Sequence, residues 1–293
     1  MSDLIEDKSS ADGSSPTADP IKKKPRLSMI IILIIAWVVT LMPFLFWRAT
    51  WFGGKLNNQQ TARYLSDNQH PRNAQHALAQ ISDRLSRGDR SVEQFYPQVL
   101  KLADSPVMEL RMTTAWVMGQ DNSYAPFHTS LLKGLADPQA LVRWNAALAL
   151  VRFGDAAGRP VLIEMLRPFK VTAPTAGIFK ERLKVGDRVN RGTLLARIET
   201  PSNQTEEFRS PVPGQIQTIL PQNGSTLTKD QAVFSLLPDE KNVWEALRGL
   251  YLVGLPEDLS AIEPYTRSTP GLSSRISEQA RQTIESIQRR AGK

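Results

Sequence analysis

The side chains that could do chemistry are few and widely separated in this sequence. The chain contains no cysteine, which excludes disulfides, thiolate metal sites and thiol nucleophiles. Its three histidines, His70, His76 and His128, include no pair with metal-ligand spacing such as HExxH. Walker A, GxGxxG and GxSxG patterns are also missing. The adjacent Glu206 and Glu207 could act as acid and base, but neighbouring carboxylates on a polar loop are usually only hydrated. We therefore predict no catalytic residue, no cofactor, no metal and no enzymatic activity.

Composition limits the remaining possibilities. The chain has 293 residues, of which 41% are hydrophobic and 22% charged, and this is typical of about two globular domains. The formal net charge of +7 is concentrated in part in the KKKPR run at 22–26. Because that run directly precedes a long apolar segment, membrane topology explains it better than nucleic-acid binding does. We predict neither a nucleic-acid partner nor a small-molecule substrate.

The N-terminal region combines a polar tail with an apolar run. Residues 1–26 are rich in Ser, Asp, Pro and Gly and predict a disordered cytoplasmic tail. Residues 27–47, LSMIIILIIAWVVTLMPFLFW, carry no charge, and a helix of about 20 such residues matches a hydrocarbon core of about 30 Å. We expect a transmembrane helix here. A buried soluble helix would be shorter or amphipathic, and a cleaved signal peptide would not follow a long polar tail.

The flanks of this run predict its orientation. Basic residues precede the run and aromatic residues follow it, as in the positive-inside rule and the interfacial aromatic belt. We expect a single pass through the cytoplasmic (inner) membrane, with the N-terminus cytoplasmic and the later domains periplasmic. The residues predicted at the membrane interface are Lys22, Lys23, Lys24, Arg26, Trp47, Trp51 and Phe52.

Internal similarity follows the apolar run. When 99–118 is laid over 131–150, Pro106 falls on Pro138 and Arg111 on Arg143, and the apolar positions keep helical spacing. The segment LADPQALVRWNAALALVRFGD at 135–155 resembles the HEAT-like repeat family in its short bacterial form, which includes bilin lyases. That resemblance implies an α-solenoid, and repeats of this kind mostly supply a surface rather than an activity. Asp137 and Pro138 are expected at the start of a second helix and Gly154 at its end.

One helix pair is interrupted. Residues 158–168 predict its first helix, but the matching second helix does not appear until 243–254, where Trp244 aligns with Trp144 and Gly254 with Gly154. Exposed turns tolerate such insertions. We therefore divide the extramembrane part into a first solenoid segment at 48–169, an insert at 170–238 and a completing segment at 239–293. The number of helix pairs, four or five, stays open, with 64–81 as a degenerate capping unit.

The insert shows alternation of apolar and polar residues with Gly and Pro turns, which predicts β-strands. Its two halves align, and a pseudo-twofold sandwich follows from that alignment. The aligned pairs are Pro174 with Pro211, Gly177 with Gly214, Leu183 with Leu220, Val189 with Leu227, and Ile198 with Leu236. The motifs APTAG, KVGDRV and SPVPG resemble the biotinyl/lipoyl domain family, including unmodified relatives in periplasmic membrane-fusion adaptors.

The position that would carry a cofactor lacks a lysine. In the family's carriers the modified lysine projects from the central hairpin, and the matching positions here lie near Ser202 and Asn203 in the tip TPSNQTEE. Lys184 and Lys229 fall in other turns. The resemblance therefore implies a carrier fold without cargo. The adaptor relatives have a long helical hairpin at this tip, whereas this chain has a short polar loop.

These patterns together predict a multi-domain α plus β protein with a single transmembrane helix, a HEAT-like α-solenoid and an inserted β-sandwich of the barrel-sandwich hybrid type. We expect a non-catalytic, membrane-anchored scaffold or adaptor that binds protein partners in the same membrane. A periplasmic component of an export or efflux system, and a biotin or lipoyl carrier subunit, are the alternatives. Trp116, Trp144 and Trp244 fit either core positions or an aromatic anchor on a concave face.

Overall fold

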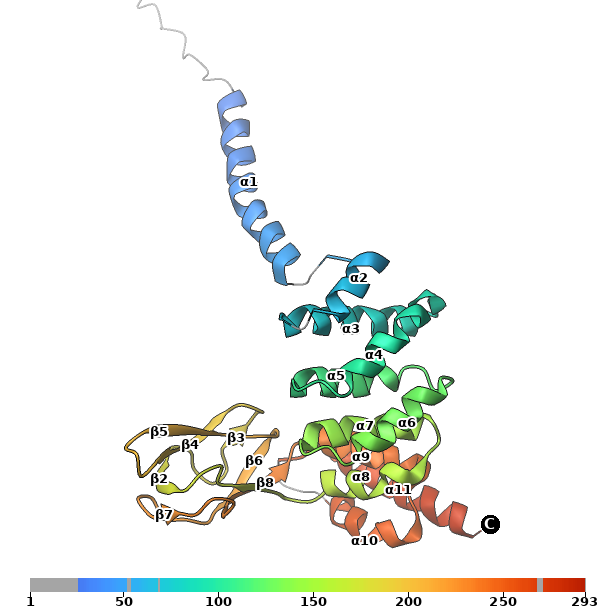
Figure 1. Ribbon diagram of the computed structural model, residues 1–293, viewed down its shortest axis with the longest axis vertical. Coiled ribbons are helices and arrows are strands. Elements are labelled where there is room, and N and C mark those ends of the chain that lie inside the picture. The colour runs from blue at the N-terminus through green and yellow to red at the C-terminus, as the bar shows by residue number, and fades with distance from the viewer. Residues whose placement is uncertain (1–25, 52–53, 68, 268–270, 293) are drawn as a thin grey trace, which may run out of the picture. The chain divides into compact units, whose positions relative to one another are not determined.

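The computed structural model describes residues 26–51, 54–67, 69–267 and 271–292, and the chain divides into two compact units, 1–54 and 55–293. The described residues form eleven α-helices and two small antiparallel sheets, so the protein belongs to the α plus β class (Figure 1). The predicted disordered tail at 1–26 lies outside the described residues, apart from Arg26 at the start of the first helix.

The first unit contains helix α1, Arg26–Trp51. Among the residues that the structure describes, no helix reaches the combination of length and hydropathy needed to cross a bilayer. A crossing requires about 20 consecutive apolar residues, and the side chains described in α1 extend from 31 to 43. The predicted transmembrane helix at 27–47 is therefore wrong by this criterion. The fold class that included it, the single-pass inner-membrane location and the membrane anchor are corrected with it.

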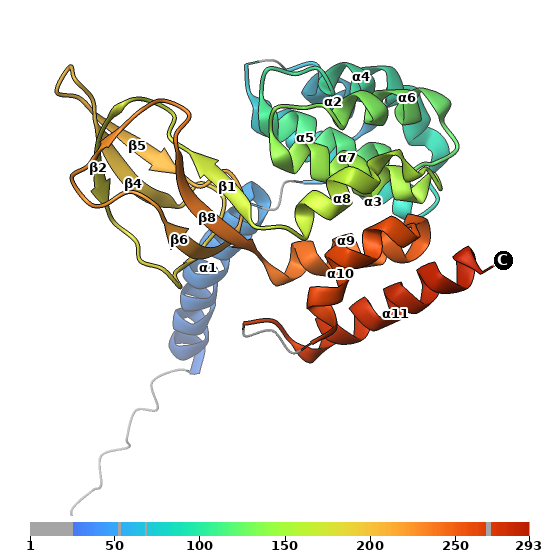
Figure 2. The same ribbon diagram turned by 90° about the horizontal axis from the view of Figure 1, so that it is seen from below.

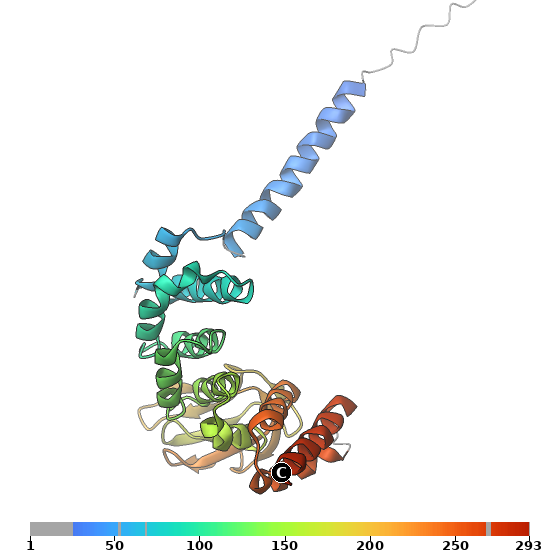
Figure 3. The same cartoon turned by 90° about the vertical axis from the view of Figure 1, so that its right-hand side faces the viewer.

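Consecutive helix pairs make up most of the second unit. The second helices of the pairs contact one another in chain order. Figure 3 shows the pairs stacked along a curve, with α3, α5 and α7 on its inner side and α4 and α6 on its outer side. The pairs are α2 (Asn58–Leu65) with α3 (Pro71–Ser86), α4 (Tyr96–Leu102) with α5 (Met108–Met118), α6 (Ala125–Gly134) with α7 (Ala140–Arg152), α8 (Arg159–Met165) with α9 (Glu240–Val253), and α10 (Leu259–Ile262) with α11 (Ser274–Ala291).

Small residues set the close approach of neighbouring helices. A methyl group added at Gly119, after α5, would lie 2.8 Å from the Ala149 Cβ of α7. One added at Gly134, at the end of α6, would lie 3.1 Å from the Ala146 Cβ. Distances this short leave no room for larger side chains, since packed carbon atoms prefer about 3.5–4.0 Å. The alanines of 135–155 therefore serve close helix packing.

The start of α7 differs from the expectation. Asp137 and Pro138 were expected as N-cap and first helical residue, but α7 begins at Ala140 with Gln139 as N-cap. The Asp137 carboxylate instead accepts the Gln139 N–H at 2.8 Å and two bonds from Arg111, at 2.7 and 3.0 Å. Its role is to join two helix pairs as well as to close the turn.

The two aligned glycines end their helices differently. Gly154 follows α7 with φ +72°, the left-handed conformation that glycine adopts most easily. Gly254 follows α9 in an extended conformation, and a methyl group there would lie 2.7 Å from the Ile287 Cδ1 of α11. The alignment is correct in position, but Gly254 is needed for the close approach of α11.

Eight strands lie between α8 and α9. The strands are β1 (Phe169–Thr172), β2 (Gly177–Glu181), β3 (Arg188–Val189), β4 (Leu194–Glu199), β5 (Thr205–Arg209), β6 (Gly214–Ile219), β7 (Thr226–Leu227) and β8 (Ala232–Pro238). They form two four-stranded sheets with the orders β1-β8-β6-β3 and β5-β4-β2-β7. If the first four strands are exchanged with the last four in order, each sheet order becomes the other. The two halves of this β-module are therefore related by a pseudo-twofold axis.

Matching glycines mark the symmetric positions. Gly177 begins β2 and Gly214 begins β6, and a side chain at either would collide with a backbone carbonyl, that of Glu199 or Leu237. Phenylalanines fill the space between the sheets, with ring centroids 6.0 Å apart for Phe179–Phe234. Of the aligned leucines, Leu220 is 62% exposed, so it is a turn residue and not part of this core.

The helices on either side of the β-module in the sequence pack against each other. A methyl group added at Gly249 in α9 would lie 2.9 Å from the Leu162 Cδ1 of α8. Figure 2 shows α8 and α9 side by side, with the β-module beside them. The polypeptide thus leaves the stack after α8, forms both sheets and returns to complete the same helix pair.

Candidate binding groove

The residues predicted at a membrane interface cannot be placed. Lys22, Lys23, Lys24 and Phe52 lie outside the described residues. Arg26, Trp47 and Trp51 belong to the backbone of α1, but their side chains lie outside the described part of the chain. No functional site is built from them.

The three histidines each have a local polar neighbour. His70 Nδ1 lies 3.1 Å from Asp67 Oδ2, and His76 Nε2 lies 2.7 Å from the side-chain nitrogen of Gln80. His128 Nε2 lies 2.6 Å from Asp155 Oδ2. No group of three or more metal-ligating side chains occurs among the residues searched, those that the structure describes. The histidines are therefore engaged in contacts within and between helix pairs.

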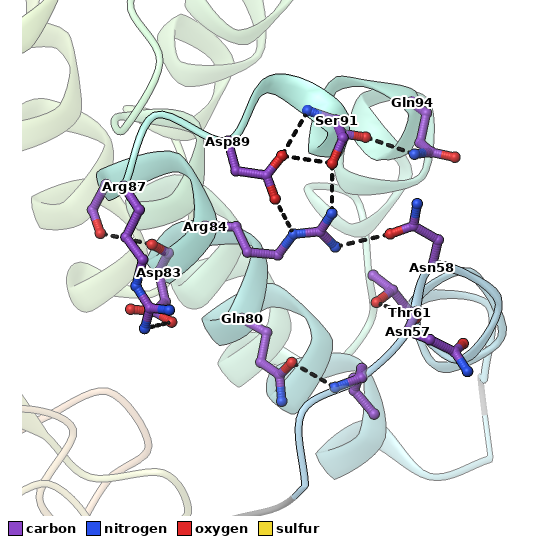
Figure 4. A network of polar contacts seen from close by, with 12 residues as sticks. Asn57, Asn58, Thr61, Gln80, Asp83, Arg84, Arg87, Asp89, Ser91 and Gln94 are labelled. Carbon is purple, nitrogen blue, oxygen red and sulfur yellow. Dashed lines mark hydrogen bonds and ion pairs between the residues drawn. The ribbon is translucent and has the colours of Figure 1, made fainter.

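A polar network ties the first helix pairs together. Figure 4 shows Arg84 of α3 at its centre, donating to Asp89 Oδ2 at 2.7 Å, Ser91 Oγ at 2.7 Å and Asn58 Oδ1 at 3.1 Å. Bonds from the Ser91 hydroxyl and then from Arg84 lower the pKa of Asp89 to about 2. Each of these groups already has its partners, so the network is a structural joint.

Similar joints recur along the stack. Arg90 binds Asp121, His128 binds Asp155 and Arg159 binds Asp258. In each case the basic residue belongs to a first helix or its leading turn, and the aspartate precedes the next pair. Arg90 and Asp121 are 31 residues apart, whereas Arg159 and Asp258 are 99 apart. The contact between consecutive helix pairs is therefore kept where the β-module is inserted.

Asp121 is the most enclosed of these carboxylates. Its side chain is 3% exposed and accepts bonds from the Tyr96 hydroxyl at 2.6 Å and the Ser123 hydroxyl at 2.6 Å. Burial raises the pKa of Asp121, but the bonds from Ser123 and Tyr96 and the charge of Arg90 outweigh burial and lower that pKa to about 2. The Asp121 carboxylate therefore stays ionised at neutral pH, held by hydrogen-bond donors and a charge from neighbouring residues of the fold.

The β4–β5 hairpin has no lysine at its tip. Its tip is closed by a bond from the Thr200 N–H to the Gln204 carbonyl at 2.8 Å, and Asn203 adopts a left-handed φ of 58°. Lys184 lies between β2 and β3, and Lys229 between β7 and β8. Both lysines therefore lie in turns other than that of the β4–β5 hairpin.

The three tryptophans have different environments. Trp144 is 4% exposed, its Nε1 lies 3.3 Å from Glu164 Oε1, and it belongs to the core. Trp244 is partly buried, with the Arg275 guanidinium 3.5 Å from its ring centroid. Trp116 is 46% exposed. The core interpretation thus holds for Trp144, while Trp116 is free to act as an aromatic anchor.

Trp116 stands at the meeting point of two surface grooves. The central groove, of about 820 Å³, crosses the second helices α5, α7, α9 and α11. The side groove, of about 550 Å³, runs from α5 and α7 to the β-module. Residues common to both are Trp116, Asn145, Leu148, Lys241 and Glu245. An exposed indole on a concave surface is the arrangement that favours a binding hot spot.

The β-module forms one wall of the side groove. Asn190 and Arg191, from the turn between β3 and β4, line it together with Pro213. Arg191 also forms an ion pair with Glu109 of α5. This contact joins the β-module to a helix pair that is distant from it in the sequence.

Further contacts fix the module at its entry. The Trp144 and Phe169 rings pack edge-on with centroids 6.2 Å apart. The Tyr265 hydroxyl donates to the Leu166 carbonyl at 2.6 Å, and burial raises the pKa of Tyr265 to about 12. Because these contacts hold the β-module in place, it can form a rigid side of the groove.

Sequence reasoning did not identify most of the groove residues. Arg152, Lys241, Arg248 and Leu252 are exposed residues on second helices and line the central groove. The available signal was the spacing of Lys241, Glu245, Arg248 and Leu252, which follow one another at three or four residues and so share one face of α9. Without the structure, that face could not be told from an ordinary solvated one.

No protein-family model and no curated protein matches this chain. The groove geometry is thus the basis on which a function can be proposed.

Proposed function

We propose that the unit 55–293 is a non-catalytic scaffold that binds a segment of a partner protein in the central groove. The observation that carries this proposal is Trp116, a large aromatic side chain that is 46% exposed where the two grooves meet. Tryptophan is among the residues that dominate binding energy when a partner covers them.

The surroundings of Trp116 support a protein ligand. The central groove also carries Leu252, 59% exposed, and Tyr251, 38% exposed, beside the amide side chains of Gln120 and Asn145. Apolar anchors with a few hydrogen-bonding groups are typical of surfaces that recognise polypeptide segments. A curved stack of helix pairs offers such a surface along its inner side, as a HEAT-like solenoid would.

The β-module has a structural role in this proposal. We take it as a lipoyl-like fold that has kept its two sheets and serves as a wall, since the β4–β5 tip has no lysine and Arg191 faces α5. Two connections to α8 and α9 hold it, so it does not swing as a carrier domain does. This part of the proposal is independent of the identity of the partner.

The test is quantitative co-purification of the full chain from its native cells after mild crosslinking. We expect a partner recovered in constant ratio with the wild type, and at least about tenfold less of it with Trp116→Ala, because removing a hot-spot tryptophan typically costs about 2 kcal/mol or more. Leu220→Ala is the matched control, since Leu220 is 62% exposed on a turn of the β-module, outside the linings of both grooves. Equal recovery with both variants would refute the proposal.

A further inference from the structure

The central groove has an excess of positive charge. Its lining includes the three cations Arg152, Lys241 and Arg248 and the single carboxylate of Glu245. All three cations are exposed. The side groove is balanced, because two cations, Lys241 and Arg191, and two carboxylates, Glu245 and Asp239, line it. The positive charge is therefore concentrated where α7, α9 and α11 meet.

These cations are not engaged by carboxylates of the described chain. Most arginines that join helix pairs have a carboxylate within 4.0 Å, as Arg111 and Arg159 do. By contrast, no ion pair within that distance is found for Lys241, Arg248 or Arg152 in the described ranges; Arg152 Nη1 donates to the neutral Gln120 side chain at 3.1 Å. Their positive charges are therefore available to pair with an acidic ligand.

We infer that the occupant of the central groove is an acidic segment of a partner protein, in which aspartate or glutamate side chains alternate with a large apolar side chain. This inference rests on the proposed function and specifies its ligand. The apolar side chain would pack on Trp116 and Leu252, and the acidic side chains would lie beside Lys241 and Arg248. Complementary charge of this kind selects the partner and speeds its association.

The size of the groove fits a short segment. Packed helices lie about 8–10 Å apart, so the path from α5, which carries Trp116, to α11 covers about 24–30 Å. An extended chain rises about 3.3 Å per residue, which corresponds to about seven to nine residues. Two or three acidic side chains on one side of such a segment would meet the three cations.

A protein segment fits better than a nucleic acid. A single-stranded nucleic acid binds along a positively charged groove that tracks its backbone, with aromatic side chains on which successive bases stack. Here three cations and the carboxylate of Glu245 line one groove, and the aromatic side chains in its lining are Trp116 and Tyr251. The chemistry selects a ligand with few charges and an apolar anchor.

The test uses the full chain and an array of synthetic peptides of about nine residues, long enough to span the groove. Each peptide combines Leu, Phe or Trp with Glu or Asp, and each has counterparts with Gln or Asn and with Lys at the acidic positions. The tightest peptide is then titrated by fluorescence anisotropy. An oligothymidylate of similar charge is titrated in parallel.

We expect the best acidic peptide to bind at least about tenfold more tightly than its amide counterpart, and its affinity to fall as salt is raised from about 50 to about 500 mM. Lys241→Glu with Arg248→Glu should remove this difference. The matched control reverses two exposed charges of the β-module, Arg182→Glu with Lys184→Glu, and should leave the affinity unchanged.

Other outcomes separate the inference from the proposed function. If amide or basic peptides bind as tightly as acidic ones and still depend on Trp116, the inference is overturned and the scaffold proposal stands. If the acidic peptides do not bind, or the oligothymidylate binds more tightly than they do, the inference is likewise overturned. In that case co-purification with Trp116→Ala decides the scaffold proposal separately.

Discussion

Replacing Asp121 by asparagine should destabilise the second unit by about 2–3 kcal/mol at neutral pH. The pKa of Asp121 is lowered to about 2 in the folded protein, against about 3.9 in an unfolded chain, and each pKa unit corresponds to about 1.4 kcal/mol. The side chain is 3% exposed, so water does not screen this interaction. Arg90 is 58% exposed and contributes less to the lowered pKa than the hydroxyls of Ser123 and Tyr96, of which that of Tyr96 is buried.

The pH dependence identifies the cause. Because the folded-state pKa lies below the unfolded value, the carboxylate stabilises the fold fully above a pH of about 5, and this stabilisation is lost as the pH falls through about 2. The difference between wild type and Asp121→Asn should therefore shrink progressively below a pH of about 4. Urea unfolding followed by circular dichroism at several pH values measures it.

A surface pair provides the control. Asp83 pairs with Arg87 at 2.5 Å, but their side chains are 53% and 63% exposed. Asp83→Asn should cost less than about 1 kcal/mol, because exposed ion pairs contribute little. A cost for Asp121→Asn below about 1 kcal/mol, or one that does not change between pH 7 and low pH, would refute the reasoning.

Three further predictions concern the architecture. Arg159→Ala should lower the free energy of unfolding by about 2–4 kcal/mol, because it leaves Asp258, 8% exposed, without its cation. Hydrogen exchange should then quicken in α10 and α11. Unchanged exchange there would contradict a stabilising role for this ion pair between the helix pairs. Gly249→Leu should destabilise by at least about 1–3 kcal/mol in thermal unfolding, since its side chain would displace Leu162 and separate α8 from α9. Intact-mass measurement should give the mass of the unmodified sequence. A biotin or lipoyl adduct on any lysine would disprove the proposal that the β-module carries no covalent cofactor.

Much of the helical architecture could be predicted because it depends on local patterns. Helical spacing at 99–118 and 131–150 predicted α5 and α7, and the Trp244 alignment placed α9 after the β-module. The N-cap prediction at Asp137 was wrong because α7 begins at Ala140, and the Asp137 carboxylate binds both the Gln139 N–H and the Arg111 guanidinium, which is 26 residues away. The contact with Arg111 depends on the packing of two pairs and has no local signal.

The β-module, too, could be predicted in its local features but not in its distant contacts. The glycine and proline turns predicted two similar halves, and both sheet orders follow that symmetry. The contact of Arg191 with Glu109, 82 residues away, had no sequence signal, and neither did the groove wall that it helps to form. The transmembrane prediction at 27–47 depended on composition alone, and no helix that could cross a bilayer is found among the described residues.

The central claim is that the groove around Trp116 holds a partner polypeptide. Its most direct test keeps Trp116 and places a photo-crosslinking amino acid at Gln282, an exposed residue that lines the central groove, in the full chain. Native cells are irradiated and the products are mapped by mass spectrometry, with the same amino acid at Leu220 for comparison. We predict that a partner peptide is joined to the chain at position 282 and not at position 220. No adduct at 282, or equal adducts at both positions, would contradict the account.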